Sequence, residues 1–339
     1  MVSPNLTISG FQHQAVRDLA WCLSSPPLFD ALPDVETLIL PEPWYRDSTV
    51  NGQLHDWLRQ LDREPSPLLA HLRQARSPRL GIYFEGLFGF FWRHFPQHRV
   101  LHQNLQVKQE KTTLGEFDFI ARQRQKWLHI ETAVKFYLGV EPRERGQSSP
   151  TESEWHQWVG PNCNDRLDKK LHRLLQHQLK LSHHPAAQVQ LARLGIRVEQ
   201  LQTALQLQGY LFYPAHTPLP PPHHSSAAHL RGLWYYWRDF RELLTRLSPC
   251  DWILLPKSNW LSPARITTGS DDNQTPRILS AEQICKQLAD YFDSSVTPTR
   301  QRPLLLAKIA AEDDIWWERE RCFVVPDHWP WNTTPSLNT

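Results

Sequence analysis

Apolar residues recur with helical spacing in several parts of the chain. Between residues 80 and 95 they form a face about four turns long, ended by Pro96, with Gly86 and Gly89 inside it. Glycine lowers helix stability, so close packing against a neighbouring element would explain both glycines. Ser280 and Gln283 have the spacing of a capping box. The predicted helices are residues 11–23, 53–61, 67–75, 80–95, 165–181, 229–247 and 281–292.

Runs rich in β-branched and aromatic residues separate these helices. Three such runs follow one another after residue 96, joined by short polar turns, one of which is the basic segment 122–126. The predicted strands are residues 100–107, 116–121, 127–138, 206–213, 252–255, 304–309 and 322–325. This order of elements predicts an α/β protein, whose central domain has a mixed sheet of about four strands flanked by helices.

Composition divides the chain into three parts. Residues 214–226 contain five prolines, which exclude regular structure and indicate a linker. Residues 1–78 form a helical N-terminal region, which we expect to cover another part of the protein. We expect a core domain over residues 79–214 and a small α/β unit over residues 227–331, in which no chemical motif occurs.

The overall composition excludes several classes of protein. The 339 residues are 40% hydrophobic and carry 37 Lys+Arg against 35 Asp+Glu, which excludes a disordered or polybasic chain. Neither GxGxxG nor GxSxG occurs, which excludes a Rossmann or serine-hydrolase motif. The five cysteines are scattered singly, as in reduced proteins, and the histidine pairs 183–184 and 223–224 lack zinc-site spacing. The stretch 80–95 is too short to span a bilayer and no signal peptide is evident, so we expect a soluble, cytoplasmic protein without membrane contacts.

The two strands beside the basic turn bring acidic residues together. If the turn is centred between residues 124 and 125, Asp118 lies directly opposite Glu131, and their side chains point to one face of the hairpin. The two-residue period of a strand adds three further residues to this face, namely Glu116, His129 and Lys135. An acidic face that also carries a histidine and a lysine, backed by an apolar face, is not typical of a solvent-facing strand.

Converging carboxylates of this kind suit hydrolysis of a phosphodiester by a hard metal ion. Mg²⁺ binds oxygen ligands, and a nearby cation orients the attacking water or stabilises the developing negative charge. Asp118 and Glu131 offer such ligands, and Glu85 lies on the helix that precedes the first strand of this region.

The order of these elements resembles the PD-(D/E)XK nuclease superfamily. More closely, Gly-Glu-Phe-Asp-Phe at 115–119 and His-Ile-Glu-Thr-Ala-Val-Lys-Phe-Tyr-Leu at 129–138 resemble an uncharacterised bacterial family of unknown function assigned to that superfamily. The segments 79–85, 158–161 and 209–214 extend the likeness. The resemblance implies a nuclease-like core over residues 79–214. It also implies site roles on positions of this chain: metal binding for Glu85, Asp118 and Glu131, and a catalytic cation in Lys135.

One position departs from the superfamily pattern. The lysine usually lies two residues after the acid of the third strand, where this chain has Ala133. Lys135 lies one pleat further, so its Cα is about 13 Å from that of Glu131 rather than about 7 Å. A β-bulge would shorten this distance. Otherwise the site lacks its cation, or His129 takes its place.

Basic residues near these motifs are candidates for nucleic-acid contacts, although an ordinary solvated surface has the same pattern. They are Arg122, Arg124 and Lys126 in the hairpin turn and Lys169 and Arg173 on the helix 165–181. We expect hydrolysis of phosphodiesters in DNA or RNA that depends on Mg²⁺ or Mn²⁺. The alternatives are a catalytically inactive nuclease fold that binds nucleic acid or a protein partner, and a chance arrangement of acidic residues.

Overall fold

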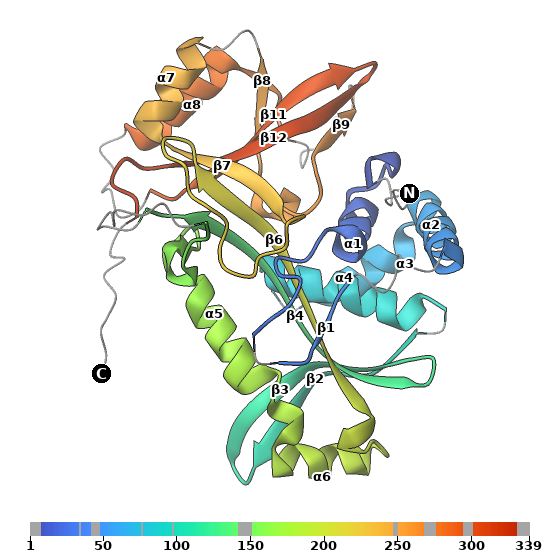
Figure 1. Ribbon diagram of the computed structural model, residues 1–339. Helices are drawn as coiled ribbons and strands as arrows, with labels where there is room; N and C mark the ends of the chain where they lie inside the picture. Colours follow the sequence, from blue (N-terminus) through green and yellow to red (C-terminus); the bar gives the residue numbers. More distant parts are fainter. Residues whose placement is uncertain are drawn as a thin grey trace. The chain divides into compact units, whose positions relative to one another are not determined.

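The computed structural model describes residues 8–33, 35–41, 48–75, 77–96, 98–141, 151–246, 250–267, 276–293 and 301–330. It is an α/β structure with mixed sheet strands flanked by helices (Figure 1). The described residues divide into two compact units. Unit one comprises those within 1–135, 169–209 and 224–230, and unit two those within 136–168, 210–223 and 231–339.

These units differ from the division that the sequence suggests at residues 78, 214 and 227. Strands β4 (Lys126–Gly139) and β6 (Leu201–Pro214) each begin in unit one and end in unit two. A local pattern of apolar residues marks a strand but not the partners that it pairs with, so a strand that serves two units is not recognised from sequence. Of the predicted proline-rich linker 214–226, Pro214 is the last residue of β6, and residues 215–226 belong to no helix or named strand.

The sheet of unit one has the strand order β6–β4–β3–β2. Strands β2 (His98–Gln109) and β3 (Thr112–Gln123) are antiparallel, and the short β1 (Leu38–Ile39) pairs in parallel with β6. The β3–β4 hairpin has the register that the sequence predicts, from Gln123 opposite Lys126 to Phe119 opposite Ile130. The strands are longer than predicted, and Phe117, expected on the apolar face with Phe119, instead packs with Ile120 and beside His129.

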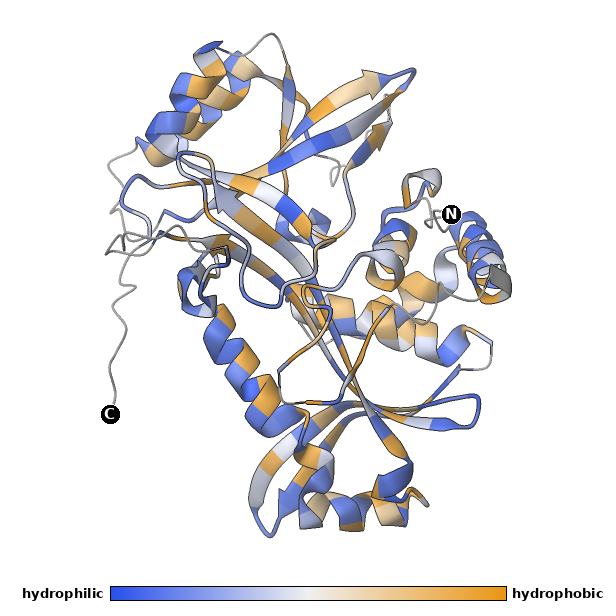
Figure 2. Cartoon of the chain, viewed as in Figure 1, coloured by the Kyte–Doolittle hydropathy of each residue, from blue (hydrophilic) through white to orange (hydrophobic). Residues whose placement is uncertain are grey.

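Helices cover both faces of these strands. Helix α4 (Leu80–His94) lies against one face, where the rings of Phe88 and Phe119 have centroids 5.4 Å apart. Ile120, the next residue of β3, points the other way and belongs to an apolar cluster with residues of α6 (Pro185–Arg193). Figure 2 shows α4 as apolar over most of its length, as expected of a helix that is buried on several sides.

The N-terminal helices pack on α4, which is the covering role that the sequence predicts. They are α1 (Gln14–Ser24), α2 (Ser48–Arg63) and α3 (Ser66–Leu72), preceded by a 3₁₀ turn at Ile8–Gly10. The hydroxyl of Tyr83 on α4 donates to the buried carboxylate of Asp18 on α1 at 2.9 Å. This buried hydrogen bond fixes α1 against the helix that carries Glu85.

The predicted helix 165–181 is not one continuous α-helix. It consists of α5 (Leu167–Arg173), a π-helical turn over Leu174–Gln178 and a 3₁₀ turn over Leu181–His183. Another 3₁₀ turn, Val198–Gln200, precedes β6. The leucines predicted on one side, Leu167, Leu171, Leu174 and Leu175, are all buried.

Unit two has the strand order β10–β8–β11–β12–β7–β6–β4. Its remaining strands are β5 (Trp158–Val159), β7 (Leu230–Tyr236), β8 (Asp251–Leu254), β9 (Arg265–Thr267), β10 (Leu279–Ser280), β11 (Leu304–Glu312) and β12 (Ile315–Val325). Its helices are α7 (Trp237–Arg246), α8 (Ala281–Phe292) and the 3₁₀ turns Trp155–Gln157 and Lys257–Asn259. The capping box predicted at Ser280 and Gln283 is present.

One predicted helix of unit two is wrong in its first half. Residues 230–236 form β7, which pairs in parallel with β12, and only residues 237–246 form a helix. The aromatic residues of β7 favour a strand, and helical burial begins at Trp237 and continues at Phe240 and Leu244. One of its two strand partners, β12, lies far along the chain, so the sequence pattern alone favours the adjoining helix.

The structure bears on the cysteines and on membrane-spanning helices. All five cysteines are unbridged thiols. Within the described ranges, no helix combines the length and the apolar character needed to cross a bilayer.

A glycine beside β4 supports a specific stability prediction. Gly209 has a φ of +141°, and a β-carbon there would lie 1.7 Å from the carbonyl oxygen of Lys135. Gly209→Ala should therefore lower the free energy of unfolding by about 3 kcal/mol or more, measured by urea denaturation. The control is Gly81→Ala on α4, where nothing lies within 4 Å of an added β-carbon. It should leave stability unchanged or raise it by up to about 1 kcal/mol; equal effects of the two variants would contradict the close approach of β4 and β6.

Candidate functional site

The ladder between β3 and β4 ends where the two predicted acids lie. Phe119 opposite Ile130 is its last pair, and Asp118 and Glu131 are the next residues on each strand. Beyond this point the carboxylate of Asp118 accepts the backbone N–H of Thr132 at 2.8 Å. A side chain thus takes over the role of a backbone acceptor, which fixes the Asp118 carboxyl group beside β4.

Glu131 is fully buried and both of its carboxylate oxygens have protein donors. His129 Nε2 lies 3.0 Å from Glu131 Oε1, and the side-chain amide of Gln178 donates to Oε2. Gln178 in turn accepts from the ammonium group of Lys170 at 3.2 Å. Gln178 of the π turn therefore contacts Glu131 directly, and Lys170 of α5 is connected to Glu131 through Gln178.

His129 holds Glu131 as a neutral ring. It is fully buried, with the ring of Phe117 edge-on at 4.6 Å between centroids, and burial lowers the pKa of His129 to about 4. Its Nδ1 has no hydrogen-bond partner among the described residues. A neutral imidazole has one N–H, and a proton on Nε2 is the arrangement that pairs with Glu131 and leaves a bare nitrogen against the apolar ring.

Glu85 completes a cluster of three carboxyl groups, which we call the carboxyl cluster: Glu85, Asp118 and Glu131. Burial, followed by repulsion from Asp118, Glu116 and Glu131, raises the pKa of Glu85 to about 7. Burial and the charge of Glu131 raise the pKa of Asp118 to about 7 as well. Burial raises the pKa of Glu131 to about 7, against the opposing charge of Lys170. Near neutral pH, the cluster therefore exchanges protons as a coupled group.

Lys170 is the cation of this cluster, and the sequence analysis missed it. Its charge lowers the pKa of each of the three carboxyl groups. Burial and repulsion from Lys135 lower the pKa of Lys170 itself. Lys135, the lysine implied by the family resemblance, thus lies close enough to act on Lys170, but Lys170 has the hydrogen-bonded connection to Glu131.

The π turn explains why Lys170 and Gln178 reach the same acid. An α-helix turns about 100° per residue, so residues eight apart in a straight helix differ by about 80° in direction. The wider π turn over Leu174–Gln178 reduces the rotation per residue and brings Gln178 towards the side of Lys170. Apolar periodicity carries no signal for a π turn, which is why the sequence did not single out this pair.

The predicted nucleic-acid contacts fall into two groups. Lys169 and Arg173 are exposed on α5 beside Lys170, and the charge of Arg173 acts on Glu131. Arg122, Arg124 and Lys126 lie at the hairpin turn, which is about six residues or 20 Å along the strand from Asp118. The structure thus brings the helical pair near the carboxyl cluster and keeps the turn residues away from it.

The fit of a divalent metal can be judged from the donors. Carboxylate oxygens are the ligands that Mg²⁺ prefers, and Mg²⁺ is usually bound by one or two carboxylates together with waters and substrate oxygens. In the described part of the chain, no three His, Cys, Asp or Glu side chains are arranged to hold one ion. The donor chemistry therefore fits a two-carboxylate site at Asp118 and Glu131, with Glu85 near it, rather than a preformed three-ligand cage.

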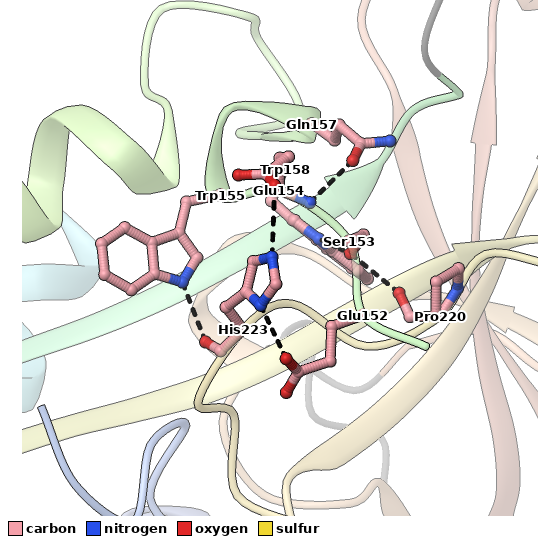
Figure 3. A network of polar contacts seen from close by, with 8 residues as sticks. All are labelled: Glu152, Ser153, Glu154, Trp155, Gln157, Trp158, Pro220 and His223. Carbon is pink, nitrogen blue, oxygen red and sulfur yellow. Dashed lines mark hydrogen bonds and ion pairs between the residues drawn. The ribbon is translucent and has the colours of Figure 1, made fainter. Parts of the chain in front are cut away.

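A second polar cluster lies in unit two, around one of the histidines expected at the surface (Figure 3). His223 is partly exposed and its two ring nitrogens lie 2.6 Å from Glu152 and 3.2 Å from Glu154. Hydrogen bonds to these carboxylates raise the pKa of His223. Ser153 Oγ accepts from Trp158 and donates to the carbonyl of Pro220. These contacts join residues 152–158 to the proline-rich segment, and we assign them a structural role.

Comparison with known proteins identifies a family. The chain matches DUF1853, a domain of unknown function, over residues 17–325. The match covers most of the chain, so the protein belongs to this family. Neither a search of curated proteins nor one of solved structures finds a match. The resemblance to the PD-(D/E)XK superfamily remains a proposal.

The raised pKa of Asp118 predicts how stability depends on pH. Between pH 4 and pH 7 the folded state retains a proton that the unfolded chain has released, so burial of Asp118 becomes more destabilising as pH rises through this range. Asp118→Asn keeps the acceptor for Thr132 and removes the charge. It should stabilise the protein by about 2–4 kcal/mol at pH 8, since each pKa unit corresponds to about 1.4 kcal/mol, and have little effect at pH 4.

Urea unfolding at the two pH values measures this difference. The control is Asp290→Asn on the exposed side of α8, which should shift stability by no more than about 0.5 kcal/mol. A gain at pH 8 that is no larger than the gain at pH 4 would show that Asp118 is ionised without cost in the folded state.

Proposed function

We propose that this member of the DUF1853 family is a divalent-metal-dependent phosphodiesterase of the PD-(D/E)XK nuclease type that acts on DNA or RNA. The observation that carries the proposal is the carboxyl cluster with Lys170 in contact with it through Gln178. The resemblance of residues 115–119 and 129–138 to nuclease motifs agrees with it.

The energetic cost of the cluster argues for a role beyond packing. Three carboxyl groups with a pKa of about 7 are each disfavoured as anions by burial and by their neighbours. Such a group of strained acids lowers stability at neutral pH, and perturbed acids of this kind concentrate at functional sites. A bound divalent cation would relieve the repulsion directly.

Asp118 and Glu131 are the residues that would hold the metal. When bound, Mg²⁺ or Mn²⁺ supplies Lewis-acid activation of the phosphate and of the attacking water. Thr132 and His129 orient the two carboxylates through the hydrogen bonds described above. Orientation of ligands by such secondary contacts is typical of metal sites.

Lys170 and Glu85 are assigned the remaining roles in the hydrolysis. Water attacks phosphorus, the bond from phosphorus to the leaving oxygen breaks, and negative charge develops on the phosphate oxygens. Lys170 stabilises this charge. Glu85, a partly exposed member of the cluster with a pKa of about 7, accepts the proton of the attacking water. The leaving oxygen takes a proton from solvent.

The substrate class is supported by the surface of α5. Lys169 and Arg173 are exposed on the helix that supplies Lys170 to the cluster. Cations beside an acidic metal site reduce the repulsion between its carboxylates and the negatively charged phosphate backbone. The five unbridged thiols agree with a reducing, cytoplasmic environment.

One observation favours the alternative, an inactive nuclease fold that binds nucleic acid or a protein partner. Both oxygens of Glu131 already have protein donors, and the residue is fully buried. A metal would have to displace the amide of Gln178 to reach Oε2. Binding of metal therefore separates the two functions.

Calorimetric titration with Mg²⁺ and Mn²⁺ tests the metal site without a known substrate. Wild type should bind, and Asp118→Asn should weaken binding by about tenfold or more, since it removes one charged ligand. Bound metal should also raise the melting temperature by mass action. If neither ion binds wild type, the inactive binding module is the better account.

Cleavage of labelled single- and double-stranded DNA and RNA in the presence of Mn²⁺ tests the lysine assignment. Lys170→Ala should slow cleavage by about 10²–10³-fold, the range for loss of one charge-stabilising group. Lys135→Ala should slow it by less than about tenfold, because Lys170 is the lysine that is hydrogen-bonded to Gln178 beside Glu131. Lys111→Gln, at the exposed β2–β3 turn, serves as the control. If Lys135→Ala slows cleavage more than Lys170→Ala does, Lys135 is the catalytic cation, as the family resemblance implies.

A further inference from the structure

Unit two contains a pocket of about 680 Å³ that plays no part in the proposed hydrolysis. Its volume lies in the range of small-molecule sites. Its floor is formed by residues of β8, β11, β12 and β7, and α7 contributes Leu243. The end of β6 and the proline-rich segment contribute Tyr213, Pro218 and Leu219. All of its lining residues belong to unit two.

A row of three residues crosses the floor of this pocket. Lys308 of β11 pairs with Trp252 of β8 on one side and with Glu320 of β12 on the other. Residues opposite each other in a sheet point to the same face. The side chains of Lys308 and Glu320 form no hydrogen bond or ion pair with any other described residue. The buried indole Nε1 of Trp252 likewise lacks an acceptor in the described part of the chain.

The three arginines of the pocket, unlike Lys308, have ion-pair or cation–π contacts within the described part of the chain. Arg319 is paired with Glu312, and Arg321 is paired with Glu318 and donates to the carbonyl oxygen of Trp260. Arg231 lies with its guanidinium 4.5 Å from the centre of the Tyr213 ring. The lining therefore combines one lysine without a partner, one acid without a partner, and aromatic rings.

We propose that this pocket binds a nucleoside phosphate. The phosphate pairs with Lys308, with Arg231 at the rim as the second cation. The base lies against aromatic and aliphatic side chains of the lining, of which Tyr213, Tyr235 and Leu243 are members. Glu320 is exposed beside Lys308 and can accept hydrogen bonds from ribose hydroxyls or an exocyclic amine, which a bare anion does not offer. This combination of one anion, several donors and one flat ring selects a nucleotide over a simple phosphate.

The proposal does not depend on the hydrolytic function of unit one. Calorimetric titration of the full chain with adenosine 5′-monophosphate, adenosine and inorganic phosphate tests it. The monophosphate should bind about tenfold or more tightly than either fragment, since each fragment loses one part of the recognition. Equal binding of monophosphate and inorganic phosphate would reduce the pocket to an unspecific anion site, and no binding of the monophosphate would overturn the proposal.

Variants locate the binding and distinguish it from the carboxyl cluster. Lys308→Gln and Arg231→Gln should each weaken binding of the monophosphate by about tenfold. Lys286→Gln, on the exposed side of α8, should leave it unchanged. Asp118→Asn should also leave it unchanged, even if that variant abolishes metal binding. If Lys308→Gln binds as wild type does, or if Asp118→Asn loses the nucleotide, the ligand does not lie in this pocket.

Discussion

A carboxylate removed from water must be hydrogen-bonded, paired with a cation or protonated, and this constraint on Glu131 determines the arrangement around it. His129 and Gln178 each donate to one of its oxygens, and Lys170 is attached through Gln178. Asp118, its neighbour across the hairpin, accepts a backbone N–H of β4. The end of the β3–β4 ladder, the π turn after α5 and the burial of His129 are all consequences of accommodating this acid.

The same constraint leaves the carboxyl cluster poised for a cation. Its hydrogen bonds compensate for burial only in part, since the pKa values of Glu85, Asp118 and Glu131 stay at about 7. A cation bound among buried acids with raised pKa values would stabilise their charged forms. Local strain of this kind is stored at a site and offset by packing elsewhere, here by the aromatic contacts between α4 and β3.

Unit two has the opposite electrostatic character at its pocket. There Lys308 and Glu320 lie opposite each other on a sheet without an ion pair in the described part of the chain, whereas Arg319 and Arg321 are each paired with a glutamate. Unit one thus offers oxygen ligands to a cation. Unit two offers a cation, Lys308, and a hydrogen-bond acceptor, Glu320, to a small polar ligand.

Local patterns in the sequence by themselves determined the helix α4, the capping box at Ser280 and the register that sets Asp118 beside Glu131. With a two-residue turn and side chains that alternate between the faces of a strand, only one register of β3 against β4 buries the apolar residues. Only the tertiary structure decided that Lys170 is hydrogen-bonded to Gln178 beside Glu131, that β7 replaces half of a predicted helix, and that β4 and β6 serve both units. Apolar periodicity records which side chains avoid water, whereas the partner of a charge or a strand edge depends on where distant parts of the chain meet.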